Sequence, residues 1–303
     1  MSVMGVKSEI STRAAELTSS RVPYVHARVV LAERPTSAKP GDEALILADG
    51  TMIGFVGGSC AESTVRAQSL ALLDSQESLL LRICPLPEEQ TEGKVTVHNP
   101  CLSGGTLEIF LEPMVPAPLI AVVGDSPIAR ALLRIGDRMG YDLVSSTEVH
   151  GAAAVVVASH GRDEQDVLVA ALRARTPYVG LVASRKRGEA VLAALDVCGS
   201  MKSQVHTPAG LDIGARSAEE VALSILAEII ASRPRPSGRT FDGDSTAAPT
   251  GVSSATSLDP VCGMTVAEVE SSLHLDHDGG RVWFCGSGCL RAFAADPAAY
   301  ADE

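Results

Sequence analysis

Residues 119–140 read LIAVVGDSPIARALLRIGDRMG, and this stretch decides the fold class. Leu119–Val123 is a short apolar run typical of a buried strand, and it ends at Gly124, after which apolar residues recur at helical spacing. Further strand-like runs follow at 141–144, 153–158 and 178–182, separated by helical segments such as 164–174. Alternation of this kind predicts an α/β domain with a doubly wound parallel sheet over residues 116–234.

The turn that follows the first of these strands matches a dinucleotide-binding turn only in part. Residues 124–129 read GDSPIA, the layout of G-x-G-x-x-A, but Ser126 stands where the second glycine would let a pyrophosphate approach the backbone. About 20 residues further on, where an acidic residue would bind a ribose hydroxyl, the chain has Ser145 and Ser146. We therefore expect Ser126 to be a helix N-cap, with Gly124 and Ser126 forming a general anion site at the helix N-terminus.

Two other segments of this domain are candidates for binding a cofactor. Ser184, Arg185 and Lys186 follow a predicted strand, at the edge where doubly wound sheets bind ligands, and the alternative is a solvated basic turn. A glycine-rich loop precedes the last helix of the domain, and it suits close approach of a ligand to the backbone. Its candidate residues are Gly210, Asp212 and Gly214.

The first 115 residues predict a separate α+β domain. A helical pattern near the N-terminus precedes a strand at 24–31, and Asp49-Gly50 predicts a hairpin between two short strands. Ser59 with Glu62 has the spacing of a capping box, so an Ala/Leu-rich helix is expected from there towards Leu81. A last strand is predicted at 106–111, and the prolines at 113, 116 and 118 predict a linker.

Two cysteines of this domain are candidate reactive thiols. Cys60 falls in the first turn of the predicted helix, where the helix dipole favours a thiolate that could act as a nucleophile, a sulfur acceptor or a soft-metal ligand. Cys101 lies in a loop between Pro100 and a Ser-Gly-Gly sequence and is the second candidate. The alternative for each is a small buried side chain, which is the role we expect for Cys84 and Cys198.

The chain ends in a short cysteine-bearing segment. Residues 235–257 are rich in Ser, Thr, Gly, Pro and Ala without periodicity and predict a flexible linker. Residues 258–303 are too few to hold a fold by core burial alone, and they contain Cys262, Cys285 and Cys289. Three thiolates in such a segment predict a site for Zn, Fe or Cu, with a fourth ligand that the spacing leaves open between Asp259, His274 and His277.

Composition limits the classes of function. The chain has 303 residues and a formal net charge of −12, which disfavours nucleic acid and anionic lipid surfaces as partners. No run of 18 apolar residues predicts a membrane span, and the N-terminal segment lacks the apolar core of a secretory signal. Seven scattered cysteines are typical of a reducing compartment, so we expect a cytoplasmic protein.

Several of these stretches together resemble the XdhC/CoxI family. They are 56–62 (VGGSCAE), 99–101 (NPC), 178–187 (YVGLVASRKR), 210–215 (GLDIGA) and 222–230 (ALSILAEII). The C-terminal residues 259–264 (DPVCGM) and 283–285 (WFC), with Cys289, resemble a YHS domain. The resemblance implies a Rossmann-like domain over 116–234, an XdhC/CoxI-type domain over 1–115 and a YHS domain over 258–303.

The resemblance also implies a function. It indicates a chaperone that transiently binds the molybdopterin-type molybdenum cofactor and supports its sulfuration and insertion into a xanthine-dehydrogenase-type or CO-dehydrogenase-type hydroxylase. The expected partners are the client apo-enzyme, a sulfurtransferase and a second copy of the chain, and the expected role is a maturation factor rather than an enzyme. The alternatives are an NAD(P)-dependent oxidoreductase and a protein that senses or delivers metal through the C-terminal segment.

Overall fold

A computed structural model describes residues 3–100, 105–233 and 255–300 of the chain. These residues form two compact units, one made of residues 1–116 together with 236–303 and one made of residues 117–235. Most of the predicted linker, residues 235–257, lies outside the described residues. None of the helices that the structure describes is both long enough and apolar enough to span a membrane.

The first unit is built on a six-stranded sheet with the order β3-β2-β1-β6-β4-β5. Its strands are β1 (Tyr24–Glu33), β2 (Glu43–Leu47), β3 (Met52–Gly54), β4 (Leu79–Cys84), β5 (Lys94–His98) and β6 (Thr106–Met114). Neighbours are antiparallel except for β4 and β5, which are parallel. The predicted hairpin is confirmed, since β2 and β3 pair across a turn in which Gly50 has a φ of +78°.

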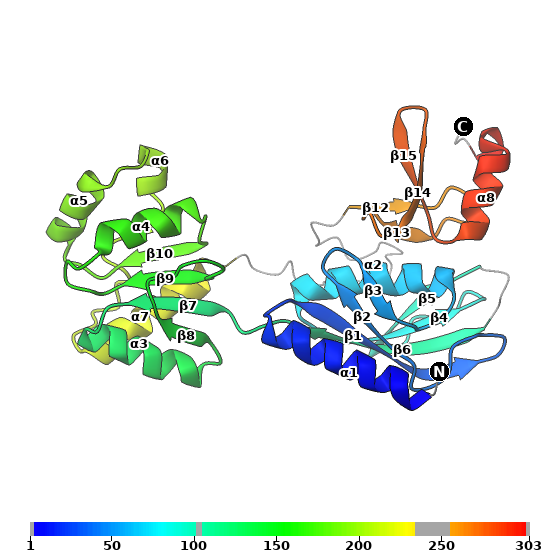
Figure 1. The fold of residues 1–303 in the computed structure, drawn as a ribbon, viewed down its shortest axis with the longest axis horizontal. Coiled ribbons are helices and arrows are strands. Elements are labelled where there is room, and N and C mark those ends of the chain that lie inside the picture. The colour runs from blue at the N-terminus through cyan, green and yellow to red at the C-terminus, as the bar shows by residue number, and fades with distance from the viewer. Residues whose placement is uncertain (1–2, 101–104, 234–254, 301–303) are drawn as a thin grey trace. The chain divides into compact units, whose positions relative to one another are not determined.

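Two helices cover opposite faces of this sheet, α1 (Val3–Ser19) and α2 (Ser59–Ser75) (Figure 1). Successive side chains of a strand point to opposite faces. On β1, Val25 belongs to the core that α2 covers, whereas its neighbour Tyr24 packs with Ile10 and Leu17 of α1. The main core of the unit therefore lies between α2 and the sheet.

The prediction of a helix from Ser59 towards Leu81 is wrong in its last part. The helix ends at Ser75, because Gln76 takes a left-handed conformation with a φ of 57° and its N–H donates to the Leu72 carbonyl. The next apolar residues form β4, which lies between β6 and β5 within the sheet. The prediction of a linker at Pro113 is also slightly too early, since β6 continues to Met114.

The C-terminal segment belongs to the first unit and contains two small antiparallel ladders followed by a helix. Its elements are β12 (Thr256–Leu258), β13 (Thr265–Ala267), β14 (Leu273–His277), β15 (Gly280–Phe284), α8 (Ser287–Ala295) and the 3₁₀ turn η1 (Pro297–Tyr300). We call residues 255–300 the cysteine module. Its buried cluster is small and centres on Met264, Val266, Trp283 and Cys285.

The second unit is a parallel five-stranded sheet with the order β11-β10-β9-β7-β8. In chain order its elements are β7 (Leu119–Val123), α3 (Pro127–Arg138), β8 (Asp142–Ser145), β9 (Ala154–Val157), α4 (Glu164–Arg173), β10 (Tyr178–Leu181), α5 (Arg185–Ala194), α6 (Gly199–Lys202), β11 (Val205–His206) and α7 (Ala218–Ala231). The predicted doubly wound parallel sheet is confirmed. The chain reverses direction across the sheet between β7 and β9, which is where sheets of this type bind ligands.

Helices cover both faces of the parallel sheet (Figure 1). Leu132 of α3 and Ile225 of α7 share one buried cluster with Val122 of β7, and Leu168 of α4 shares the other cluster with Val157 of β9. Both strands contribute to both clusters, so they are buried on two sides. This explains why these strands are continuous apolar runs rather than alternating ones.

Candidate functional site

Cys60 lies at the beginning of helix α2. The chain enters the helix through Gly57, whose φ of +148° favours glycine, and through the extended N-cap residue Gly58. Cys60 is the second residue of α2, which confirms its predicted place in the first helical turn, where the helix dipole favours a thiolate. The predicted capping box is wrong, because Ser59 is already inside the helix and no side chain caps Gly58.

A pocket of about 280 Å³ opens beside Cys60. Its lining comes from the start of α2, the strand ends of the large sheet and the segment after β1, namely Pro35, Thr36, Gly58, Ser59, Cys60, Ala61, Ile83, Asn99, Gly105 and Leu107. Gly105 is required there, because a Cβ on it would lie 2.2 Å from the Pro35 carbonyl oxygen. The second predicted thiol, Cys101, lies outside the described residues.

The three cysteines of the module come together as the sequence predicts. The Cys285 Sγ lies 3.5 Å from the Cys262 Sγ and 3.7 Å from the Cys289 Sγ. One carboxylate oxygen of Asp259 and the three sulfurs all lie within 4.8 Å of one another. A tetrahedral zinc site with Zn–S bonds of about 2.3 Å places its sulfurs about 3.8 Å apart, so the spacing of the thiols suits such an ion.

The crowding of these thiols changes their pKa values. The hydrogen bond with Cys285 lowers the pKa of Cys262, and the same contact, followed by that with Cys60, raises the pKa of Cys285. Burial, and then the nearby Asp259 carboxylate, raises the pKa of Cys289 to about 12.

The structure brings Cys60 next to this cluster, which the sequence did not predict. The Cys285 Sγ lies 4.0 Å from the Cys60 Sγ, and Cys60 packs against the buried cluster of the module. Helix α2 also packs against β13, and the Ser271 hydroxyl donates to the Asp49 carbonyl at 3.2 Å. The candidate thiol of the first domain therefore lies beside the predicted metal ligands of the last.

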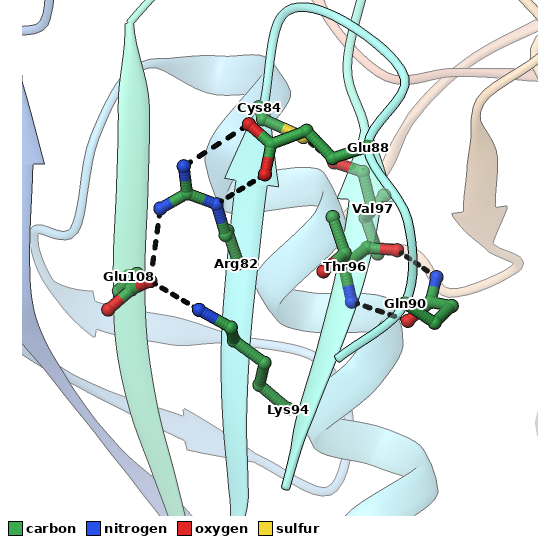
Figure 2. A network of polar contacts seen from close by, with 8 residues as sticks. All are labelled: Arg82, Cys84, Glu88, Gln90, Lys94, Thr96, Val97 and Glu108. Carbon is green, nitrogen blue, oxygen red and sulfur yellow. Dashed lines mark hydrogen bonds and ion pairs between the residues drawn. The ribbon is translucent and has the colours of Figure 1, made fainter. Parts of the chain in front are cut away.

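Cys84 has the packing role that we expected for it. It is buried on β4, its Sγ donates to the Val97 carbonyl at 3.7 Å, and burial raises the pKa of its thiol. Figure 2 shows the neighbouring Arg82 between two carboxylates, 2.8 Å from Glu88 and 3.0 Å from Glu108. These ion pairs join β4 to β6 next to the buried Cys84.

The packing role that we expected for Cys198 is wrong. Its side chain is exposed at the N-cap of α6, and the Sγ lies 3.2 Å from the Ser200 hydroxyl. That hydrogen bond, followed by one from the Met201 backbone, lowers the pKa of the thiol. Cys198 is therefore an accessible thiol in the second unit.

Gly124 and Ser126 form the turn between β7 and α3, but each has a structural task there. Gly124 has a φ of +111°, and a Cβ on it would lie 2.5 Å from the Ala158 carbonyl oxygen at the end of β9. Ser126 is buried, and its hydroxyl accepts the Ala129 N–H at 3.1 Å, which confirms the predicted N-cap. The cap uses one of the N–H groups on which the expected anion site would depend.

The basic segment after β10 is only partly available to a ligand. Ser184 caps α5, and Arg185 and Lys186 are exposed. The next residue, Arg187, pairs with the buried Glu164. Burial alone would raise the pKa of Glu164, but hydrogen bonds from Arg187 and the Gly161 N–H outweigh it and hold that pKa below its ordinary value.

The glycine-rich loop before α7 is fastened to that helix by its first glycine. The Gly210 N–H donates to the Glu228 carboxylate at 2.7 Å, and the buried Tyr178 hydroxyl donates to the same oxygen at 2.6 Å. Asp212 and Gly214 are exposed to solvent. In the order of the sheet, β9 lies between the strands that carry the Gly124 and Ser184 turns, and both turns follow the carboxyl end of their strand.

Sequence reasoning missed the residues that complete the pocket and join the module to it. Pro35 and Thr36 carry no motif, and only the structure places them beside Cys60. Gly286 follows a predicted ligand, and a Cβ on it would lie 3.2 Å from the Cys60 Sγ. A glycine directly after Cys285 indicates that another part of the chain lies close to the backbone there, but it does not indicate which part.

Two segments of the chain match known protein families. Residues 17–83 match the XdhC and CoxI family, and residues 120–229 match the XdhC Rossmann domain. The chain therefore carries XdhC-type segments in each of its two units, with Cys60 inside the first and the Gly124 turn inside the second.

Individual proteins resemble the chain over different lengths. The uncharacterized protein YqeB of Escherichia coli is 26% identical over 254 residues, covering 73% of this chain and 46% of that protein. A Bacillus subtilis protein described as a probable xanthine dehydrogenase subunit is 35% identical over 83 residues, covering 27% of this chain and 24% of that protein. A solved structure described as a xanthine dehydrogenase from Bacillus halodurans has a TM-score of 0.35 and 16% identity, covering 75% of this chain and 97% of that one. The chain spans less than half the length of the two curated relatives.

Proposed function

We propose that the chain is an accessory factor for a molybdenum hydroxylase of the xanthine dehydrogenase type and holds the molybdenum cofactor at the Cys60 pocket while that enzyme matures. One observation carries this proposal. The segment that matches the XdhC and CoxI family, residues 17–83, contains Gly58, Ser59 and Cys60, which line the pocket. A family match and a reactive thiol in a cavity thus fall on the same residues.

The residues of the pocket suit the metal-bearing end of such a cofactor. A volume of about 280 Å³ is near the lower limit of about 300 Å³ for small-molecule sites, so the pocket suits one end of a cofactor rather than a whole dinucleotide form. When bound, the cofactor would supply a molybdenum centre that takes up sulfur. A thiolate is the side chain best matched to a soft metal or to a sulfur atom in transfer.

Each side of the pocket contributes differently to the proposed role. Cys60 would present its thiolate, which the N-terminus of α2 stabilises, to the metal or its sulfur. Ile83 and Leu107 give the pocket an apolar side. Asn99 is buried directly after β5, and its side-chain amide would meet the polar groups of a pterin.

The proposal includes a division of the chain into four parts. These are an XdhC/CoxI-type domain over 1–115, a Rossmann-like domain over 116–234, a linker over 235–257 and a YHS domain over 258–303. Within the second unit, Gly124 and Ser184–Lys186 are the proposed phosphate-binding residues. The client apo-enzyme, a sulfurtransferase and a second copy of the chain are the proposed partners.

Purification of the protein with the pterin cofactor tests the proposal. Cys60→Ser should lower both the amount of molybdenum cofactor that co-purifies and the activity of a co-expressed molybdenum hydroxylase. Cys198→Ser removes an accessible thiol in the other unit and should leave both quantities unchanged. Equal cofactor retention and equal hydroxylase activity in the two variants would remove Cys60 from the mechanism.

A second candidate function is delivery or sensing of a metal ion, and the three module cysteines favour it. Here the metal in the module, and not a pterin, would be the cargo. Cys262→Ser distinguishes the two functions. A loss of metal content with unchanged maturation of the hydroxylase would favour metal delivery. If neither the unmodified chain nor Cys262→Ser matures a hydroxylase, that result would argue against the first proposal.

A further inference from the structure

Three sulfurs surround the Cys285 Sγ, and one of them comes from outside the module. Cys262, Cys289 and Cys60 place their Sγ atoms 3.5, 3.7 and 4.0 Å from the Cys285 Sγ. These distances lie on both sides of the edge of about 3.8 Å that a tetrahedral zinc–thiolate site requires. The Cys60 distance deviates from that edge no more than the Cys262 distance does.

The nearest carboxylate already has a structural task. The Asp259 carboxylate accepts the Val261 N–H at 2.9 Å through one oxygen and the Cys285 N–H at 2.8 Å through the other. The Asp259 backbone also accepts the Gly263 N–H at 2.7 Å. Asp259 thus shapes the two turns that carry Cys262 and Cys285, which is the work of a residue that positions ligands rather than of a ligand.

The two histidines that the sequence offered as a fourth ligand are engaged elsewhere. The His274 Nδ1 lies 2.9 Å from the Ser272 carbonyl, and its ring packs against Trp283 with the centroids 4.9 Å apart. The His277 ring makes an edge contact with Phe293 at 5.3 Å. Among the described residues, the group whose ligand atoms all lie within 4.8 Å of one another consists of Asp259, Cys262, Cys285 and Cys289. It includes neither histidine, and Cys60 adjoins it through the contact with Cys285.

The contact between Cys60 and the cluster depends on a glycine. A Cβ on Gly286 would lie 3.0 Å from the Ser59 Oγ and 3.2 Å from the Cys60 Sγ, which is closer than side chains normally pack. Because Gly286 has no side chain, the turn after Cys285 can lie directly on the first residues of α2. A second close approach, between Gly50 and the side chains of Val269 and Ser271, supports the same docking.

Two helix N-termini also meet at the cluster. Cys60 is in the first turn of α2, and Cys289 is in the first turn of α8, which begins at Ser287. Each N-terminus carries a partial positive charge that favours thiolates near it. Four thiolates around one divalent cation carry a net charge of −2, and this arrangement offsets part of that charge.

We propose that Cys60 is the fourth ligand of a structural Zn²⁺ site completed by Cys262, Cys285 and Cys289. On binding, the four thiols lose their protons to solvent and form four Zn–S bonds, so the ion closes the module onto the start of α2. If the proposed function holds, a further consequence rests on it, namely that the zinc-loaded form withholds Cys60 from the pocket and release of the ion frees it. The metal site itself requires no pterin.

Metal titration of the full chain tests the site. Protein stripped of metal under reducing conditions should bind one Zn²⁺ per chain, and Co²⁺ in its place should give the intense sulfur-to-metal absorption of a four-thiolate site. Cys60→Ser should reduce that absorption by about one sulfur's share and weaken Zn²⁺ binding. The loss should be at least the roughly 10- to 100-fold that follows removal of an outer-shell partner. Cys198→Ser is the matched control and should behave as the unmodified chain.

Alkylation of the unmodified chain tests the site without any substitution, so a misfolded variant cannot affect the result. Mass spectrometry should show that Zn²⁺ protects Cys60 together with the three module cysteines, while Cys198 reacts equally with and without the ion. Protection of only three cysteines, or an unchanged Co²⁺ spectrum and Zn²⁺ affinity in Cys60→Ser, would overturn the proposal. Because these measurements need no molybdenum cofactor, failure of the zinc site and failure of the proposed function are separate results.

Discussion

Replacing Gly124 with alanine asks whether the glycine of the β7–α3 turn serves packing or a ligand. Gly124 has a φ of +111°, outside the conformations that alanine readily adopts, which costs about 1–3 kcal/mol. Its new Cβ would lie 2.5 Å from the Ala158 carbonyl oxygen and 2.7 Å from the Ser159 Cα. Both contacts are with backbone at the end of a central strand, so relief requires the turn to move, and such overpacking costs about 1–3 kcal/mol.

Together these terms predict that Gly124→Ala lowers the free energy of unfolding by about 2–6 kcal/mol. The matched control is Gly140→Ala, where φ is +75° and no atom lies within 4 Å of the new Cβ. That variant should lose only the strain of a left-handed residue, about 1–2 kcal/mol. With a urea slope of about 1–3 kcal/mol per molar, the two variants should differ by about 1 M in their midpoints.

The assay can separate the two units. Trp283, the only tryptophan of the chain, lies in the cysteine module and reports on the first unit. Gly124→Ala should shift the far-UV circular dichroism transition and increase hydrogen exchange in the peptides of β7 and β9, without shifting the Trp283 fluorescence transition. If Gly124→Ala and Gly140→Ala lowered the free energy of unfolding equally, the packing argument would be refuted. Ligand binding would then be the remaining explanation for Gly124.

Two further substitutions test the docking of the module and the ion pair of the second unit. Gly286→Val should weaken the contact with Cys60 by about 1–3 kcal/mol, which is about a 5- to 150-fold change in the docking equilibrium. The weaker contact should make alkylation of the Cys60 thiol faster. Gly288→Val, at a position with no atom within 4 Å, should not do so, and equal rates would contradict the close approach. Glu164→Gln should cost about 1–3 kcal/mol at neutral pH. Because the folded-state pKa of Glu164 is lowered from 4.5, its contribution is present above pH 4.5 and lost as the pH falls through the lowered value. Urea midpoints of the unmodified chain and the variant should therefore converge in acid, and a constant gap would be the contrary result.

The parallel sheet was predictable because its signals are local. Strands of the second unit are buried on both faces, so each is a continuous apolar run, and each is followed by a helix within a few residues. The helix N-caps of this unit could also be predicted from local sequence. Ser126 caps α3 ahead of Pro127, as predicted, and the capping box that Ser217 and Glu220 form at the start of α7 has an equally local Ser-x-x-Glu spacing.

The first unit was less predictable because its central strands depend on distant partners. Leu79–Cys84 continues an Ala/Leu-rich helix after a short break, and its apolar residues suit a helix as well as a strand. What makes it a strand is pairing with β6 more than 20 residues later, together with a left-handed residue at Gln76 that ends the helix. β5, which pairs in parallel with β4, depends on the same non-local choice.

The contact between Cys60 and the cysteine module could not be predicted either, because it joins residues even further apart in the chain. The module buries few apolar residues, and together with its three cysteines this led the sequence to predict a metal site. No local pattern could say that the module also docks on α2 at Cys285, because Cys60 is 225 residues away in the chain. In the proposed zinc site, metal binding and docking are linked and must strengthen each other by the same factor. A change that loosens the contact at Gly286 should therefore also weaken the metal site, although Gly286 offers no ligand atom of its own.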